Sequence, residues 1–217
     1  MSDAPDSAPR PPRSGLPLFD LIISVCALVM SAVSIFMANQ NSNSMQDLVH
    51  ANSWPFLQVD SGNTSDDGTQ HVLQFGVSNA GVGPARIYSS AFLVDGRPVH
   101  GTDIFAKIAR GCCESEYQSI TAGTTNPYDA LGDVMTSIVA PKVLAARDSV
   151  VALRWARTDR NAALWAAIDQ ARQHGRITMR VCYCSVFNEC WIGESNELPK
   201  PSSACVEQQS PFSPHRP

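Results

Sequence analysis

The sequence predicts a mainly β protein, an Ig-like antiparallel β-sandwich with one or two short helices, preceded by a single transmembrane α-helix. An apolar segment near the N-terminus carries no charge from Leu21 to Ala38. Further along, short stretches alternate apolar and polar residues between turn-forming residues. We therefore expect a disordered tail at 1–15, a transmembrane helix at 16–38, a stalk at 39–53, a β-sandwich domain at 54–198 and a C-terminal tail at 199–217.

Composition narrows the class of protein. The chain has 217 residues, of which 44% are hydrophobic and 17% are charged, and its formal net charge is −4. Such a chain can bury a core, so it is not disordered as a whole. It lacks the excess of Lys and Arg that neutralises a phosphate backbone. We therefore expect no nucleic-acid partner.

The apolar segment predicts a membrane anchor. At about 1.5 Å per residue, its 18 uncharged residues nearly cross a hydrocarbon core of about 30 Å, and the residues before Leu21 supply the remainder. Arg10 and Arg13 precede the helix, and the next Lys or Arg is Arg86. This asymmetry predicts a cytoplasmic N-terminus. A signal peptide cleaved near Ala32-Val33-Ser34 is the alternative.

One face of the predicted helix carries only small residues, at a helical spacing of four, three and four. Small residues on one stripe allow a second helix to approach closely. The face is therefore a candidate packing surface for a second copy or another membrane protein, although short side chains also occur there by chance. It consists of Ala27, Ser31, Ser34 and Ala38.

The β-domain has identifiable strands and two helical interludes. Leu73, Phe75 and Val77 fall on one face of a strand at 71–78, which illustrates the pattern. Two glycines and a proline in 79–85 predict a tight turn. Further strands are expected at 56–59, 85–95 and 148–157, a hairpin at 176–191, and helices at 102–111 and 158–175, with 120–146 ambiguous.

Four short motifs in this order resemble a group of uncharacterised bacterial single-pass inner-membrane proteins with a small extracytoplasmic β-domain. They are Trp54-Pro55-Phe56, Asn79-x-Gly81-x-Gly83-Pro84-Ala85, Asp95-Gly96 and Cys182-Tyr183-Cys184…Cys190-Trp191. The resemblance covers about 17–195. It implies a bacterial inner-membrane location with the main domain in the periplasm, and it carries no known activity or catalytic residue.

Six cysteines lie outside the membrane segment: Cys112, Cys113, Cys182, Cys184, Cys190 and Cys205. An even number in an oxidising compartment predicts three disulfides. If the last hairpin turns near Phe187, Cys184 lies opposite Cys190 and the two can pair. Cys112 and Cys113 would then reach Cys182 and Cys205. A thiol-redox or thiolate-metal enzyme centred on Cys182, Cys184 and Cys190 is the alternative, although the spacings fit no usual zinc or thioredoxin-like motif.

No catalytic constellation, cofactor motif or metal motif is evident, so we expect no catalytic residue, no cofactor and no metal. A membrane-anchored, non-catalytic binding or assembly module is the favoured function, with a protein partner or self-association. An accessory subunit of a larger inner-membrane complex is a further alternative. The candidate partner contacts are Asn79, Gly81 and Gly83 in the turn and Phe187 and Asn188 at the hairpin tip.

Overall fold

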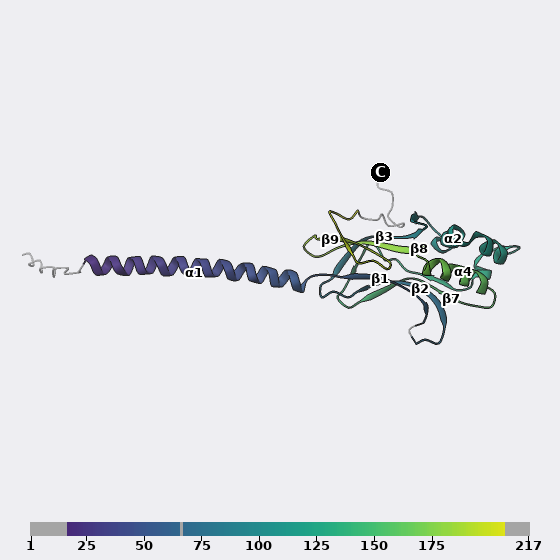
Figure 1. The fold of residues 1–217 in the computed structure, drawn as a ribbon, viewed down its shortest axis with the longest axis horizontal. Coiled ribbons are helices and arrows are strands. Elements are labelled where there is room, and N and C mark those ends of the chain that lie inside the picture. The colour runs from purple at the N-terminus through teal and green to yellow at the C-terminus, as the bar shows by residue number, and fades with distance from the viewer. Residues whose placement is uncertain (1–16, 66, 207–217) are drawn as a thin grey trace, which may run out of the picture. The chain divides into compact units, whose positions relative to one another are not determined.

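The computed structural model describes residues 17–65 and 67–206, which form two compact units, Met1–Val49 and His50–Pro217 (Figure 1). The predicted tail at 1–15, with Arg10 and Arg13, lies outside the described residues, and so does the C-terminal tail from 207 onward.

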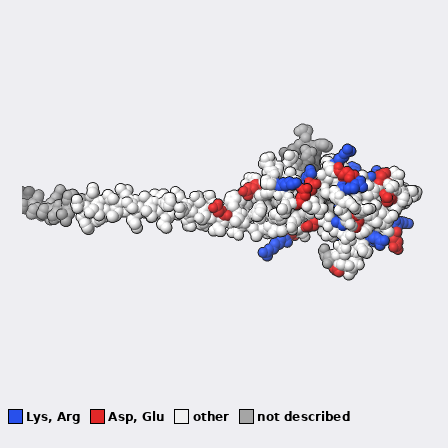
Figure 2. Space-filling model, viewed as in Figure 1, with Lys and Arg blue, Asp and Glu red and all other residues white. Residues whose placement is uncertain are grey.

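The described part of the first unit belongs to one long helix, α1 (Pro17–Asn52). Over Leu18–Asn52 it is long and apolar enough to cross a membrane. Figure 2 shows most of its length in white, without the colours of Lys, Arg, Asp or Glu. The helix was expected to end near Ala38 in a fraying stalk, but it continues to Asn52. Residues 39–52 contain no Pro or Gly, so nothing in this polar segment interrupts the helix.

Two antiparallel sheets form most of the second unit, together with three shorter helices in the described part of the chain. The first sheet has the strand order β1-β2-β7-β5, and the second has the order β10-β9-β8-β3-β4 with β6 beside β3. The first contains β1 (Leu57–Thr64), β2 (His71–Asn79), β5 (Val134–Thr136) and β7 (Ser149–Ala156). The second contains β3 (Ala85–Val94), β4 (Arg97–Val99), β6 (Lys142–Leu144), β8 (Ile177–Cys184), β9 (Cys190–Glu194) and β10 (Lys200–Ser202).

Period-2 patterning explains which strand residues form the core. In β8 the alternate residues Ile177, Met179, Val181 and Tyr183 are fully buried, whereas Arg180 between them is exposed. The apolar face of β2, a strand of the first sheet, is buried as well. The buried residues of both strands belong to one hydrophobic cluster. The strands expected from alternation therefore lie where the sequence places them, with their apolar faces toward this cluster.

The helices α2 (Ile104–Thr121), α3 (Tyr128–Leu131) and α4 (Ala162–Gln173) add to the same core. Figure 1 shows α2 and α4 together at one end of the sheets. Trp155 of β7 is completely buried there. Its Nε1 donates to the carbonyl oxygen of Leu131 (2.7 Å), and its ring lies 4.6 Å from that of Phe105.

Two helix boundaries differ from the expectation. The helix predicted at 102–111 runs on to Thr121, with a non-helical residue, Cys113, inside it. Cys113 marks a kink between two helical stretches, and it lies two residues after Gly111, where the predicted helix was to end. The helix predicted from Thr158 begins at Ala162, because the buried Asn161 organises the preceding loop. The Asn161 Oδ1 accepts the backbone N–H of Thr158, and its Nδ2 donates to the carbonyl oxygen of Leu131.

The end of the described chain is not a free tail. Residues Lys200–Ser202 form β10, which pairs antiparallel with β9. This added strand brings Cys205 back over the second sheet.

Candidate functional site

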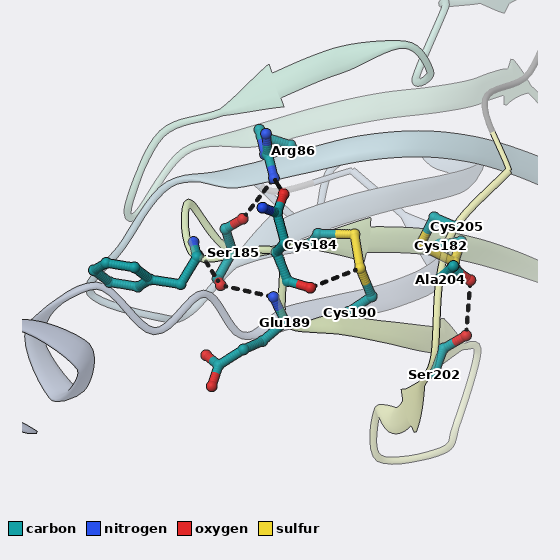
Figure 3. Close-up of a disulfide and its surroundings, with 11 residues drawn as sticks. Arg86, Cys182, Cys184, Ser185, Glu189, Cys190, Ser202, Ala204 and Cys205 are labelled. Atoms are coloured by element: carbon teal, nitrogen blue, oxygen red, sulfur yellow. Dashed lines mark hydrogen bonds between the residues drawn. A yellow bond between two sulfur atoms is a disulfide. The ribbon is translucent and has the colours of Figure 1, made fainter.

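The two loops predicted to contact a partner lie at the same end of the β-domain. Arg86 follows the 79–85 turn and is paired with Cys184 at the end of β8. Its Nη2 donates to the carbonyl oxygen of Ser185 (3.0 Å) and to Oδ1 of Asn188 at the hairpin tip. Figure 3 shows the guanidinium directed at this tip. Two segments about 100 residues apart in the sequence are therefore joined by one side chain.

The geometry of the turn depends on Asn79, whose side chain is an internal support and not a free contact group. Asn79 is buried, and its Oδ1 accepts the backbone N–H groups of Phe56 (3.2 Å) and Gly81 (3.0 Å). Its Nδ2 donates to the carbonyl oxygens of Gly83 (2.8 Å) and Ala145 (3.1 Å). Buried polar groups satisfied in this way hold loops in one conformation.

The glycines of the turn also have an internal role. A Cβ atom on Gly81 would lie 2.4 Å from the backbone nitrogen of Phe56, and one on Gly83 would lie 2.0 Å from the carbonyl oxygen of Ser53. The turn therefore needs glycine at both positions because the backbone before β1 passes against it. Val82, between them, faces solvent and is the large apolar side chain that this turn exposes.

The hairpin tip has the opposite character. The Ser185 hydroxyl accepts the backbone N–H groups of Phe187 and Glu189, which closes the turn from inside. Asn188 has a left-handed backbone (φ 65°), a conformation that Asn tolerates better than most residues. Phe187 stacks on the His50 ring at 4.1 Å, while 41% of its surface stays exposed.

Exposed apolar side chains gather around these two loops. We call this region the contact end. Its members are linked by the hydrogen bond from the Val82 N–H to the carbonyl oxygen of Trp54 (3.1 Å), by the pairing of Val143 with Arg86, and by the bonds of Arg86 to the hairpin tip. The contact end comprises Trp54 (51% exposed), Val82 (57%), Val143 (64%), Val186 (47%) and Phe187 (41%).

Sequence reasoning missed Arg86, Trp54 and Val143 as members of this region. Arg86 had one available signal, since it is the first Lys or Arg after the long helix and directly follows the turn. For Val143 no signal existed, because β6 is a three-residue strand inside a stretch with no clear period.

The cysteines form three disulfides, of which one was predicted correctly. Cys184 pairs with Cys190 across β8 and β9 (S–S 2.06 Å), as the hairpin geometry suggested. Cys182 pairs with Cys205 (2.06 Å).

The remaining prediction, that Cys112 and Cys113 reach Cys182 and Cys205, is wrong. Cys112 and Cys113 pair with each other, and we call this bond the vicinal disulfide. They lie in α2, which packs against α4 and β3, whereas Cys205 follows β10 on the other side of β8.

Two of the disulfides lie next to each other on the second sheet (Figure 3). The Sγ atoms of Cys184, Cys190 and Cys205 all lie within 4.8 Å of one another. Cys184 is buried, whereas Cys190 and Cys205 are partly exposed. After reduction, three thiolates at this spacing have the donor chemistry for Zn²⁺ or Cu⁺. In the oxidised chain the same sulfurs are positioned for exchange with one another.

A shallow groove of about 270 Å³ crosses the outer face of the first sheet. Small and polar residues line it, including Asp60, Gly76 and Ser78. The Ser78 hydroxyl donates to Asp60 (2.9 Å). Among the described lining residues Asp60 is the one ionisable side chain, and there is no histidine, cysteine or pair of adjacent acids.

The most enclosed carboxylate, Asp169 in α4, has a structural environment. Burial alone would raise its pKa, but hydrogen bonds from Asn63 and Arg172, the positive charge of Arg172 and a bond from Gln173 together hold the pKa below its usual value. Arg172 also donates to the Ser61 hydroxyl (3.2 Å). The group thus ties α4 to β1 as a stable ion pair, which is unlike a proton-transfer site.

The small-residue face of α1 remains available in the structure. Ala27, Ser31, Ser34 and Ala38 are all exposed in the single chain. The Ser31 hydroxyl donates to the carbonyl oxygen of Ala27 (2.8 Å), and that of Ser34 donates to the carbonyl oxygen of Met30 (2.7 Å). These bonds satisfy the hydroxyl donors within the helix, so the face is compatible with an apolar surrounding.

The described residues therefore present a contact end of exposed apolar side chains and a group of adjacent disulfides, and Arg86 borders both. Comparison of the chain with protein-family models, with curated proteins and with solved structures found no match.

Proposed function

We propose that this protein is a membrane-anchored, non-catalytic binding or assembly module whose contact end docks a protein partner. The observation that carries the proposal is the gathering of exposed apolar side chains from separate segments at one end of the domain. Scattered apolar residues on a surface are ordinary, whereas a contiguous group at loop tips is typical of an interaction site.

The rigidity of the contact end supports this role. Asn79 fixes the turn, Ser185 fixes the hairpin tip, and Arg86 joins the two. Loops that are already ordered lose little conformational entropy when a partner binds. Trp54 and Phe187 supply the large aromatic area that interface anchors usually provide.

The strand order supports an Ig-like domain. Assigning β1, β2, β5 and β7 to strands A, B, D and E gives the sheet ABED, and β9, β8 and β3 then correspond to G, F and C. Departures from that pattern are the helices inserted before β5 and after β7, and disulfides that do not link strands B and F. In Ig-like domains the loops at the ends of the sandwich are common binding surfaces.

The anchor and the disulfides support the location that we propose, a bacterial inner membrane with a cytoplasmic N-terminus and a periplasmic domain. The apolar part of α1 can cross a bilayer, and three disulfides are compatible with an oxidising compartment. A thiol-reactive, membrane-impermeant probe applied to intact cells tests the orientation after reduction of the disulfides.

The function is tested by cross-linking in intact membranes. A photoreactive amino acid replaces Phe187 or Val82, and the matched control replaces Met135, which is similarly exposed (48%) but lies in β5 outside the contact end. We expect a discrete adduct of the same size from Phe187 and Val82 and none from Met135. A Trp54→Asp substitution in the same chain should abolish that adduct. Equal adducts at all three positions, or none at any, would refute the proposal.

A further inference from the structure

We propose that the Cys182–Cys205 and Cys184–Cys190 disulfides form one thiol–disulfide exchange site, in which Cys184 is the exchanging thiolate and Cys205 is the sulfur that it attacks. The site would take a dithiol as its substrate. This role is separate from the proposed docking function, because it depends on the positions of the cysteine sulfurs and not on contact with a partner.

The sulfurs of the two disulfides lie close together. Thiol–disulfide exchange needs a thiolate close to a sulfur of an intact disulfide. The Cys205 Sγ lies within 4.8 Å of both sulfurs of the neighbouring Cys184–Cys190 bond. If that bond opens, a sulfur of the second bond is already the nearest reaction partner.

The sheet register places a cationic residue and a second cysteine on either side of Cys184. Cys184 of β8 is paired with Arg86 of β3 on one side and with Cys190 of β9 on the other. Residues directly opposite each other in an antiparallel pair project from the same face. The Arg86 and Cys184 side chains therefore leave the sheet on the same face, and the Arg86 guanidinium donates to the carbonyl oxygen of Ser185, the residue next to Cys184 (3.0 Å). A nearby cation favours a thiolate. Two further ionisable side chains lie at this hairpin, Glu189 within it and His50 stacked on its tip, and their Oε1 and Nδ1 atoms are 3.9 Å apart.

The solvent exposure of the cysteines indicates the order of the exchange steps. Cys190 is partly exposed, so it is the sulfur of its bond that an incoming thiolate can reach, whereas Cys184 is buried. Cys205 lies after β10 in a segment without regular secondary structure, which is the part of the site with the least backbone pairing.

The reaction has three exchange steps, and each step forms one S–S bond and breaks one. A thiolate of the dithiol attacks Cys190, its bond to that sulfur forms, and the electron pair of the broken Cys184–Cys190 bond leaves on Cys184. The Cys184 thiolate attacks Cys205, the Cys184–Cys205 bond forms, and Cys182 leaves as a thiolate that takes a proton from water. The second thiol of the dithiol then displaces Cys190, so the dithiol is oxidised and this chain is reduced by two electrons.

The intramolecular step can be tested without any co-reactant. In the full-length Cys190→Ser chain in detergent, Cys184 loses its partner and the proposal predicts a Cys184–Cys205 bond with a free thiol on Cys182. Free thiols are alkylated at acidic pH after denaturation, and chymotrypsin, which cuts after aromatic residues, separates Cys182 from Cys184 at Tyr183. Mass spectrometry then shows which cysteine carries the label. Label found on Cys184, with the Cys182–Cys205 bond intact, would overturn the proposal.

A matched variant controls for nonspecific exchange. Cys113→Ser also adds one unpaired thiol to that of Cys26, the thiol of Cys112, but outside the group of adjacent sulfurs. We expect the label to stay on Cys112. Scrambling of Cys182–Cys205 in this control as well would mean that the exchange needs no special geometry and would overturn the assignment.

The wild-type chain gives an independent readout if Cys190→Ser does not fold. After brief treatment with one equivalent of dithiothreitol, the first two-electron-reduced species should carry label on Cys182 and Cys190. Label on Cys184 and Cys190 instead would show that the second step does not occur.

Arg86 acts here as a positioning residue through its charge. Loss of a neighbouring cation that shifts a thiol pKa by about one unit lowers the thiolate fraction roughly tenfold, and higher nucleophilicity of the more basic thiolate offsets part of this. In the Cys190→Ser background, Arg86→Gln should therefore slow exchange about threefold at pH 7 and move its pH profile to higher pH. Arg86→Lys keeps the charge and should restore the rate. An unchanged rate in Arg86→Gln would remove Arg86 from the site.

Discussion

Asn79→Ala should strongly destabilise the β-domain while leaving the long helix unaffected. The Asn79 side chain accepts two backbone N–H groups and donates to the carbonyl oxygens of Gly83 and Ala145, with a longer contact to that of Leu144 (3.3 Å). Its amide nitrogen has two hydrogens, so four hydrogen bonds are counted. Alanine can replace none of them.

The magnitude follows from these bonds. A hydrogen bond contributes about 1 kcal/mol net, and a buried group left without its partner costs about 1–3 kcal/mol. Some of the released groups lie near the surface and can bind water, since the bonds to Phe56, Gly81 and Ala145 are only partly buried. We therefore expect a loss of about 4 kcal/mol in the free energy of unfolding, a large part of a typical domain's stability.

Urea unfolding followed by tryptophan fluorescence measures this loss. All four tryptophans, Trp54, Trp155, Trp165 and Trp191, lie in the β-domain, so the signal reports on it even in the full-length chain in detergent. The control is Asn126→Ala, because Asn126 is exposed and accepts one exposed backbone bond, from Tyr128. It should cost less than about 1 kcal/mol. If Asn79→Ala also costs less than about 1 kcal/mol, the turn does not depend on this side chain.

Three further predictions test other parts of the structure. Gly83→Ala should cost about 3 kcal/mol in urea unfolding because its methyl group meets backbone, whereas Gly62→Ala, which meets open space, should cost far less; equal costs would contradict the close approach. Asp169→Asn should cost about 2 kcal/mol at pH 7. Because the folded-state pKa of Asp169 lies below 3.8, its charge stabilises the fold above that pH, so the difference from wild type should shrink as the pH falls below 3.8, and a pH-independent difference would argue against the ion pair. Denatured without reductant, the chain should show one titratable thiol, that of Cys26, whereas three thiols would mean that one of the three disulfides is absent.

Local patterns in the sequence were sufficient for the helix that can cross a membrane and for most strands. A run of uncharged residues and a period of two are properties of neighbouring residues, so they can be read without the fold. The same holds for the Cys184–Cys190 bond, since a short turn fixes which residues of a hairpin lie opposite each other.

Tertiary structure decided the remaining disulfides. The Cys182–Cys205 bond depends on β10 pairing with β9, a three-residue strand that composition alone describes as tail. The pairing of Cys112 with Cys113 depends on the course of α2, where a single non-helical residue, Cys113, interrupts the helix. Disulfides require their Cα atoms to be close in space, and closeness between distant segments is set by packing.

The candidate site shows the same division. The sequence by itself determined that the 79–85 turn and the Phe187 hairpin tip are tight loops, because glycine, proline and asparagine restrict or free backbone angles locally. Only the tertiary structure decided that Asn79 faces inward and that the two loops adjoin. The start of β3 pairs with the end of β8, and this register places Arg86 beside Cys184. A register between distant strands is fixed by the shared core that both strands bury, which no local pattern contains.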